Sequence, residues 1–225
     1  MPVSCCDLWT TVGKKYLAAA AGLVFLVFVI VHLGGNLLLL LDNPNLYNSY
    51  SHHLVSLGPL LWFGEAVLLA FFLLHAVIGT LVYIRAREAR PVGYHEIADA
   101  GKPSRKTLSS RTMIWSGIVI LVFTILHLIT FKFGEHYTVV VDGIEMRDFH
   151  TLVVEVFQKP GYVVWYLLAM VLLGLHLRHG FWSAFQSLGV NHPRYTPFIY
   201  GLGTVLAVLL AFGYIVIPIY VYFKY

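Results

Sequence analysis

The sequence contains five apolar runs, each long enough to cross a lipid bilayer, which takes about 20 helical residues. They cover roughly residues 16–41, 60–84, 113–133, 162–185 and 198–223. Hydrophobic residues make up 59% of the 225-residue chain and charged residues only 12%, a balance that excludes an ordinary soluble domain. We therefore predict an all-α integral membrane protein, with residues 1–225 forming one membrane domain of five transmembrane helices.

The basic residues predict the orientation of this bundle. If the five helices alternate in direction, eleven of the Lys and Arg residues fall on one side and four on the other. Cytoplasmic loops carry the excess of basic residues, so the N-terminus is expected in the cytoplasm and the C-terminus outside. We expect a multi-pass protein of the cell's inner (plasma) membrane. The first run has no small-residue cleavage site and is too long for a signal peptide, so it is expected to be retained. This placement of the basic residues accounts for the basic pI better than nucleic-acid binding does.

Four of the five runs carry a histidine within them: His32, His75, His127 and His176. An imidazole in hydrocarbon needs a partner, because unsatisfied polar groups there are costly. A single such histidine is usually a packed, hydrogen-bonded core residue. One in each of four membrane segments instead favours two pairs, each binding one haem iron from both sides.

The alternating helix directions sort these histidines by depth. His32 and His127 fall in the outer half of the membrane, and His75 and His176 fall in the inner half. We therefore predict two b haems stacked across the membrane, one held by the outer pair (His32/His127) and one by the inner pair (His75/His176). His179, one turn after His176, is the competing ligand; its alternative roles are a propionate contact or a solvated helix end.

Glycines near the histidines are consistent with a flat macrocycle. Gly35, Gly79 and Gly180 follow His32, His75 and His176 by three or four residues and share their helix faces. The alternative is that these small residues tighten helix–helix contacts. At the level of the inner haem, the candidates for its propionate groups are Lys15, Arg111, Trp115 and Arg178.

The loops suggest further sites. Glu65, near the outer start of the second helix, is a candidate for handling protons at a quinone site, and equally a hydrated helix-start acid. His52, in the outer loop after the first helix, is a second quinone-site candidate. A short hairpin is expected around Asp142 and Gly143. The cytoplasmic loop 85–111 is a plausible docking surface for a partner, and the adjacent Cys5 and Cys6 have no assigned role.

Four stretches of the sequence resemble one family. VHLGGN at 31–36, LHAVIG at 74–79, the SRTMIWSG…LHLITFKFG run at 110–134 and LHLRHGFWS at 175–183 are similar to the cytochrome b558 subunit of succinate:quinone oxidoreductase. This family includes five-helix, two-haem succinate dehydrogenases and quinol:fumarate reductases. The resemblance covers essentially the whole chain and implies haem ligation by His32, His75, His127 and His176.

The resemblance also implies partners and a reaction. Two soluble cytoplasmic subunits are expected: a flavoprotein that holds FAD and oxidises succinate, and an iron–sulfur subunit that passes electrons to the inner haem. The chain would have no succinate site of its own, would deliver electrons to menaquinone, and could belong to a higher oligomer of the complex. Some fumarate reductases of the family have a glutamate two residues before the histidine ligand of the fourth transmembrane helix, the position of His176 here. Here that position is Gly174, which favours succinate oxidation over fumarate reduction.

Two other readings stay open from the residues alone. The first is a di-haem cytochrome b of another quinone-linked dehydrogenase, such as a hydrogenase or formate dehydrogenase, which would differ only in its soluble partner. The second is a haem-free membrane enzyme with a metal site, or a transporter. Membrane enzymes with histidine boxes cluster HxxxH and HxxHH motifs at one face, whereas this chain has one HxxH, at 176–179, and spreads its other histidines through the bilayer.

Overall fold

A computed structural model describes residues 10–89 and 107–225. Cys5, Cys6 and most of the predicted docking loop lie outside the described residues. Within them, five helical segments are long and apolar enough to cross a membrane. They are α1 (Thr11–Asn36), α3 (Pro59–Glu88), α5 (Met113–His127), α7 (Pro160–Ser187) and α8 (Thr196–Lys224).

Helices α3, α7 and α8 extend beyond the predicted apolar runs at both ends, and α1 begins before its run, whereas α5 stays within its run. The α1 helix begins at Thr11 because the side chain of Thr10 accepts a hydrogen bond from the backbone of Gly13, a favourable cap. It continues into a 3-10 turn, η1 (Leu37–Leu40), and α5 continues into a π-helical turn, η2 (Leu128–Lys132). Apolar content marks the hydrocarbon-spanning part, whereas caps and turns set the ends.

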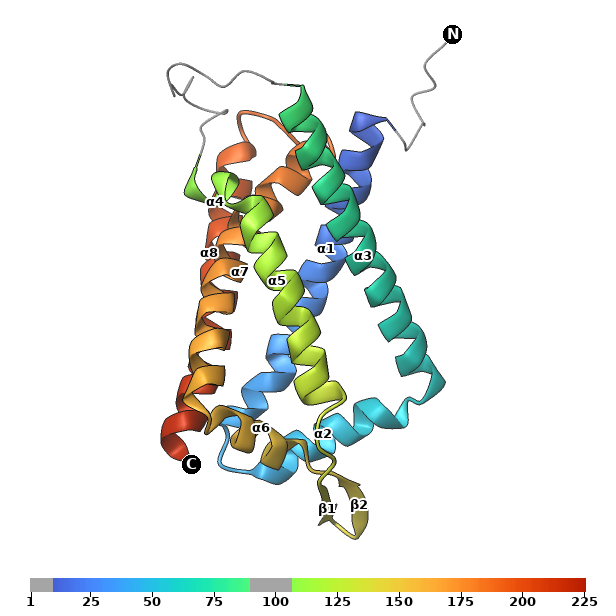
Figure 1. The fold of residues 1–225 in the computed structure, drawn as a ribbon, viewed down its shortest axis with the longest axis vertical. Coiled ribbons are helices and arrows are strands. Elements are labelled where there is room, and N and C mark those ends of the chain that lie inside the picture. Colours follow the sequence, from blue (N-terminus) through green and yellow to red (C-terminus); the bar gives the residue numbers. More distant parts are fainter. Residues whose placement is uncertain (1–9, 90–106) are drawn as a thin grey trace.

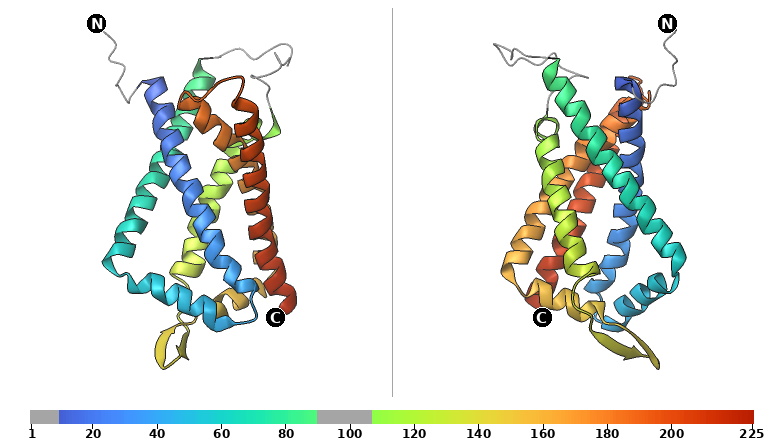
Figure 2. Two further views of the ribbon diagram at one scale, coloured as in Figure 1. Left: turned by 180° about the vertical axis from the view of Figure 1, so that it is seen from behind. Right: turned by 45° about the vertical axis from the view of Figure 1, so that its right-hand side comes forward.

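The bundle has two ends, and the first and last helices fix them. The α1 helix begins at one end, here called the N-terminal end, and α8 finishes at the other, the C-terminal end (Figure 1). Helix α7 packs against both α8 and α1. Helix α3 leans away from α5 toward the C-terminal end in every view (Figure 2), and Ile78 is its one buried residue.

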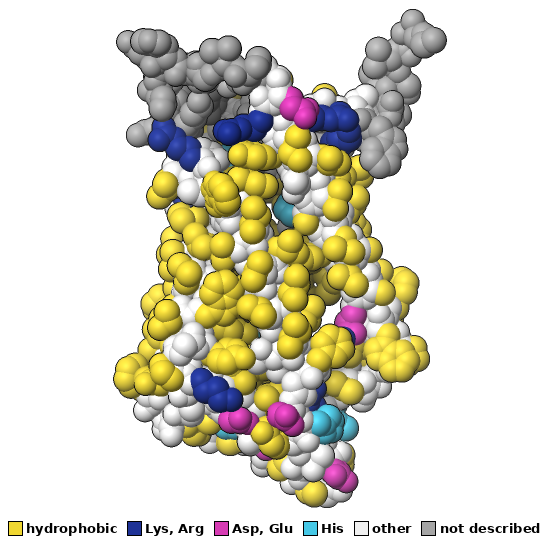
Figure 3. All heavy atoms as spheres, in the orientation of Figure 1, with side chains coloured by type: hydrophobic (Ala, Val, Ile, Leu, Met, Phe, Trp, Pro, Cys, Tyr) yellow, Lys and Arg dark blue, Asp and Glu magenta, His cyan; other side chains and the backbone are white. Residues whose placement is uncertain are grey.

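The surface of the bundle is a broad apolar band. Hydrophobic side chains cover the middle of the molecule, with Lys and Arg gathered at the N-terminal end (Figure 3). Large side chains are exposed along every long helix, for example Phe212 on α8 at 65% and Leu69 on α3 at 54%. Apolar exposure on this scale indicates a surface that faces lipid.

Shorter elements cover the C-terminal end. Helix α2 (Pro44–Ser56) and helix α6 (Phe149–Phe157) form where the sequence analysis expects outer loops. Asn43 caps α2 by accepting from the backbone of Asn45, and Pro44 starts the helix with a favourable φ. A four-residue helix, α4 (Leu108–Arg111), precedes α5 at the N-terminal end.

The sheet found in the described part of the chain is a two-stranded hairpin. Strands β1 (Thr138–Val141) and β2 (Ile144–Arg147) pair antiparallel, with Val141 opposite Ile144. The connecting residues Asp142 and Gly143 both have positive φ, 51° and 80°, as a two-residue hairpin turn requires. The predicted hairpin is therefore confirmed, and it is the one departure from an all-helical fold among the described residues.

Candidate functional site

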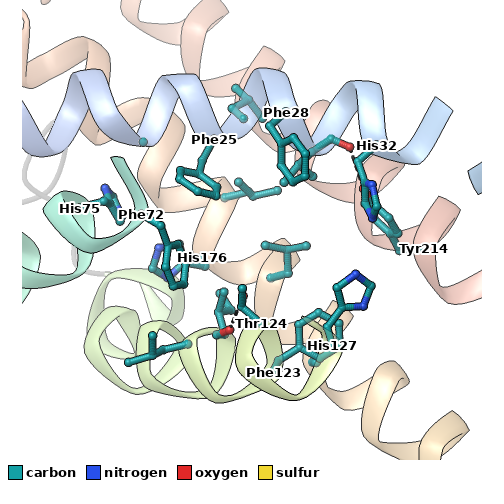
Figure 4. Close-up of a pocket in the computed structure, with 18 of the residues that line it drawn as sticks. Phe25, Phe28, His32, Phe72, His75, Phe123, Thr124, His127, His176 and Tyr214 are labelled. Carbon is teal, nitrogen blue, oxygen red and sulfur yellow. Dashed lines mark hydrogen bonds between the residues drawn. The ribbon is translucent and has the colours of Figure 1, made fainter. Parts of the chain in front are cut away.

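A cavity of about 1290 Å³ runs along the bundle between α1, α3, α5 and α7. It extends from Lys15 near the N-terminal end to Lys132 and Arg147 near the C-terminal end. Most of its lining is apolar. Figure 4 shows aromatic side chains in its middle, and all four predicted ligands line it: His32, His75, His127 and His176.

The four histidines meet in two groups within this cavity. The His32 and His127 rings, from α1 and α5, lie with their centroids 5.8 Å apart. The His75 and His176 rings, from α3 and α7, lie 6.2 Å apart. In Figure 4, His75 and His176 lie toward the left of the view and His32 and His127 toward the right.

The spacing within each pair matches a shared metal ion. Two imidazoles that bind one ion from opposite sides have centroids about 6 Å apart, since each metal–nitrogen bond is about 2 Å and the ring centre lies about 1 Å further. The observed 5.8 and 6.2 Å agree with this value. The side chains present therefore fit a haem iron with two axial histidines.

Hydrogen bonds fix the rings of the inner pair. The Nδ1 atom of His75 lies 3.0 Å from the carbonyl oxygen of Ala18 on α1. A carbonyl only accepts, so Nδ1 carries the hydrogen and Nε2 keeps its lone pair. The Nδ1 atom of His176 lies 3.0 Å from the hydroxyl of Ser116, which donates its own hydrogen to the carbonyl of Met113. Both rings are therefore held at Nδ1 with Nε2 left available, the arrangement found in histidines that bind a metal through one ring nitrogen.

The outer pair is held by a tyrosine and by ring stacking. The Nδ1 atom of His127 lies 2.9 Å from the hydroxyl of Tyr166 on α7. The rings of His32 and His127 each stack on a phenylalanine one turn earlier, Phe28 at 5.3 Å and Phe123 at 5.6 Å between centroids. These contacts restrict both imidazoles to orientations across the cavity.

Two glycines that the sequence analysis missed approach the inner ligands. A Cβ at Gly22 on α1 would lie 3.2 Å from Cε1 of His75, and a Cβ at Gly117 on α5 would lie 3.6 Å from Cε1 of His176. Because Gly22 has no side chain, the His75 ring can reach the backbone carbonyl one turn earlier, at Ala18. A membrane helix contains many small residues, so the sequence alone gives no signal for these two.

The three predicted glycines have different surroundings. Gly79 and Gly180 line the cavity, and a Cβ at either would meet nothing within 4 Å. Gly35 does not line it: a Cβ there would lie 2.5 Å from the ring of Tyr50. Gly35 therefore makes room for the tyrosine that packs α2 onto α1.

The residues predicted to contact the inner propionates separate into two sets. Lys15 and His179 line the N-terminal end of the cavity. Arg111, Trp115 and Arg178 do not line it: Arg111 is exposed, Trp115 is 66% exposed on the bundle surface, and Arg178 lies 3.5 Å from the hydroxyl of Ser109. His179 is cavity-lining but contributes to neither close histidine pair.

Of the two quinone-site candidates, the structure brings only Glu65 to the cavity. Its carboxylate forms an ion pair with Lys132, which joins α3 to the end of α5, and both residues are partly exposed. His52 lies outside the cavity lining, with its ring 6.3 Å from that of His53. Lys132, like Gly22 and Gly117, is a residue that the sequence analysis missed.

A π-helical turn and Arg147 hold this end of the cavity. The guanidinium of Arg147 donates hydrogen bonds of 2.9–3.2 Å to the carbonyls of Phe131, Lys132, Gly134 and Glu135. A Cβ at Gly134 would lie 1.9 Å from the carbonyl oxygen of Thr130, so the tight turn after η2 requires glycine. The hairpin thus anchors the end of the helix that carries His127.

Comparison with protein-family models, curated proteins and solved structures finds no match to this chain. Among the residues that the structure describes, no group of three or more His, Cys, Asp or Glu side chains is placed to hold a metal ion. A haem iron takes only its axial ligands from the protein, so this second finding concerns other kinds of metal centre. The two histidine pairs are the feature of the cavity from which a function can be argued.

Proposed function

We propose that this chain is the di-haem cytochrome b membrane anchor of a succinate dehydrogenase (complex II). In this role it passes electrons from an iron–sulfur subunit in the cytoplasm, through two b haems, to menaquinone. The observation that carries the proposal is the pair of histidine contacts, 5.8 and 6.2 Å between ring centroids, at two levels of one apolar cavity. The resemblance to the cytochrome b558 family supplies the choice of partners and substrate.

Each of the two haems would be held by a different pair of histidines. His75 and His176 would hold the inner haem and His32 and His127 the outer one, with the apolar lining excluding water. A b haem supplies one-electron redox chemistry at its iron. Lys15 lines one end of the cavity and Lys132 and Arg147 line the other, and we assign these cations to the propionate groups.

The outer end of the cavity is where we place menaquinone. Its reduction to the quinol takes two electrons and two protons, so a proton-handling group is needed nearby. Glu65 lines the cavity beside Lys132, and an ionisable side chain at this depth is favourable only with a partner or water. We assign proton delivery to Glu65, with Lys132 as its counter-ion.

The surroundings of Gly174 favour succinate oxidation as the direction. A Cβ at this position would lie 2.9 Å from the Cβ of Ala211 on α8, so a longer side chain has no room without helix movement. The absence of a glutamate here, together with this close packing, supports the proposal that the chain lacks such a proton route. The chain has no succinate site of its own in this scheme, and the flavoprotein subunit performs that oxidation.

Purification of the protein with its bound partners tests the proposal. We expect an FAD-containing subunit and an iron–sulfur subunit to copurify, and the complex to reduce menaquinone when succinate is added. Glu65→Gln should lower that activity while both haems remain visible in the dithionite-reduced spectrum. Copurification with a hydrogenase or formate dehydrogenase instead would assign the chain to another quinone-linked enzyme.

A further inference from the structure

Two side-chain hydroxyls contact the predicted ligand rings, and helices α5 and α7 each supply one hydroxyl to a histidine of the other helix. Ser116 on α5 contacts His176 on α7, and Tyr166 on α7 contacts His127 on α5. Each hydroxyl reaches Nδ1 of one ring, and each belongs to a different haem level. We propose that Ser116 and Tyr166 are positioning residues that set the redox potentials of the inner and outer haem separately. This inference rests on the proposed function.

The role of Ser116 follows from its own hydrogen bonds. Its hydroxyl donates to the carbonyl oxygen of Met113 at 3.0 Å, so the oxygen is left to accept from Nδ1 of His176. Ser116 is 1% exposed, so water does not compete for this contact. The ring is thereby fixed with Nδ1 protonated and Nε2 free to bind iron.

Tyr166 is held by the aromatic residues around it. Its ring lies 4.8 Å from that of Phe123 and 5.0 Å from that of Phe157, both edge-on, and the residue is 8% exposed. This packing fixes the hydroxyl 2.9 Å from Nδ1 of His127. When His127 binds iron through Nε2, its Nδ1 carries the hydrogen, and the phenol oxygen accepts it.

A hydrogen-bond acceptor at Nδ1–H changes the redox potential of the iron through its effect on the imidazole ring. It makes the imidazole a stronger electron donor, which stabilises the oxidised metal and lowers the midpoint potential. Removing the acceptor should therefore raise the potential of the haem that the ring binds. Because each hydroxyl contacts one ring only, the two potentials should respond independently.

The test is a potentiometric titration of the b-type bands of the purified complex. Ser116→Ala should raise the midpoint of the inner haem alone, and Tyr166→Phe that of the outer haem alone. Ser109→Ala removes an equally buried hydroxyl, and Tyr162→Phe removes one a turn earlier on α7; neither residue lines the cavity. Both controls should leave the two midpoints unchanged.

A rescue separates positioning from simple packing. Ser116→Thr keeps the hydroxyl and should return the inner midpoint toward its original value. If Ser116→Ala loses the inner haem, the same threonine variant decides: a retained haem with unchanged midpoint supports the inference, and loss overturns it. Unchanged midpoints in Ser116→Ala and Tyr166→Phe, or equal shifts of both haems in either, would also overturn it. Absence of haem from the unaltered protein would instead reject the proposed function.

Discussion

A neutral imidazole has one donor and one acceptor nitrogen, and inside a membrane-spanning helix both need partners. The His75 ring illustrates how this chain meets that requirement. Its Nδ1 donates to the backbone of Ala18, and its Nε2 faces a cavity shared with His176. An acceptor nitrogen that lines this apolar cavity is the chemical reason for proposing a metal between the two rings.

The contact between Gly22 and His75 gives a prediction at this scale. Gly22→Val should push the His75 ring off the Ala18 carbonyl, because a Cβ already lies 3.2 Å from the ring. We expect loss of most inner haem, and a destabilisation of about 1–3 kcal/mol from overpacking. Haem content and the reduced spectrum measure it. Gly34→Ala is the control on α1, since a Cβ there meets nothing within 4 Å. Undiminished inner haem in Gly22→Val would contradict the role given to the contact between Gly22 and His75.

The sequence predicts which histidines lie close together, because histidine is rare in apolar runs and depth along the helices sorts these four into two pairs. It does not predict Ser116, Tyr166 or Gly22. A hydroxyl or a glycine is ordinary in a membrane helix, and its partner depends on how neighbouring helices are rotated. Gly35 illustrates the same limit: its spacing from His32 suits a macrocycle, but the packing of α2 places Tyr50 there.

At the scale of elements, the end of α5 is unusual. The π-helical turn η2 begins directly after His127, and π-turns occur often at functional sites. Its last residue, Lys132, reaches Glu65 on α3, while Arg147 from β2 binds the carbonyls that the turn leaves open. The hairpin therefore holds the C-terminal end of the cavity although it lies outside the helical bundle.

Arg147 is the residue through which the hairpin acts. Arg147→Lys keeps the charge but cannot bond four carbonyls, since lysine lacks the planar fork of donors. We expect faster hydrogen exchange over residues 128–135 and a local loss of about 1–3 kcal/mol. Outer haem should be lost more readily than inner haem. Lys159→Gln, at an exposed pair with Glu155, should have no such effect; equal exchange rates in the two variants would contradict the role given to Arg147.

The short helices α2 and α6 escaped prediction because their sequences are brief and bounded by caps, without a membrane-length apolar run. They are joined by a buried polar contact. Asn48 of α2, 1% exposed, donates to Asp148 at 2.8 Å and accepts from the backbone of His150 at 2.9 Å. Such contacts become visible only when distant segments are placed side by side.

The burial of His150 at this contact predicts that the local stability of the C-terminal end depends on pH. Burial lowers the pKa of His150 from its usual 6.5, with the charge of Asp148 opposing and that of Lys224 adding to this effect. The unfolded segment therefore takes up a proton first as the pH falls below 6.5, and local stability decreases. Amide exchange in α6, corrected for its intrinsic rate, should become faster as the pH falls from about 7 to about 5. In His150→Gln this increase should disappear; if it persists, another group is responsible.

At the scale of the whole molecule, the cavity separates α3 and α5 while α1, α7 and α8 pack together. The number and apolar character of the five long helices are predictable from length and composition. Their arrangement around a cavity is not, because it depends on how the helices are tilted and rotated against one another. Helix α3 packs against α1, and Ile78 is its one buried residue, so most of its surface faces lipid or the cavity.

Removal of haem should therefore affect α3 more than any other long helix. In the haem-depleted protein we expect α3 amides to exchange fastest among the five, and haem addition to protect them, because a ligand that binds only the folded form stabilises it. Helices α7 and α8, which pack on each other, should change least. Uniform protection of all five helices would contradict a cofactor lying against α3.

The most direct test of the central claim is the haem stoichiometry of the purified protein, measured with a dithionite-reduced minus oxidised spectrum. The account predicts b-type bands from two haems per chain, one lost in His127→Ala and the other in His75→Ala. Folded, purified protein without b-type bands would contradict it, as would the loss of both haems equally from each variant.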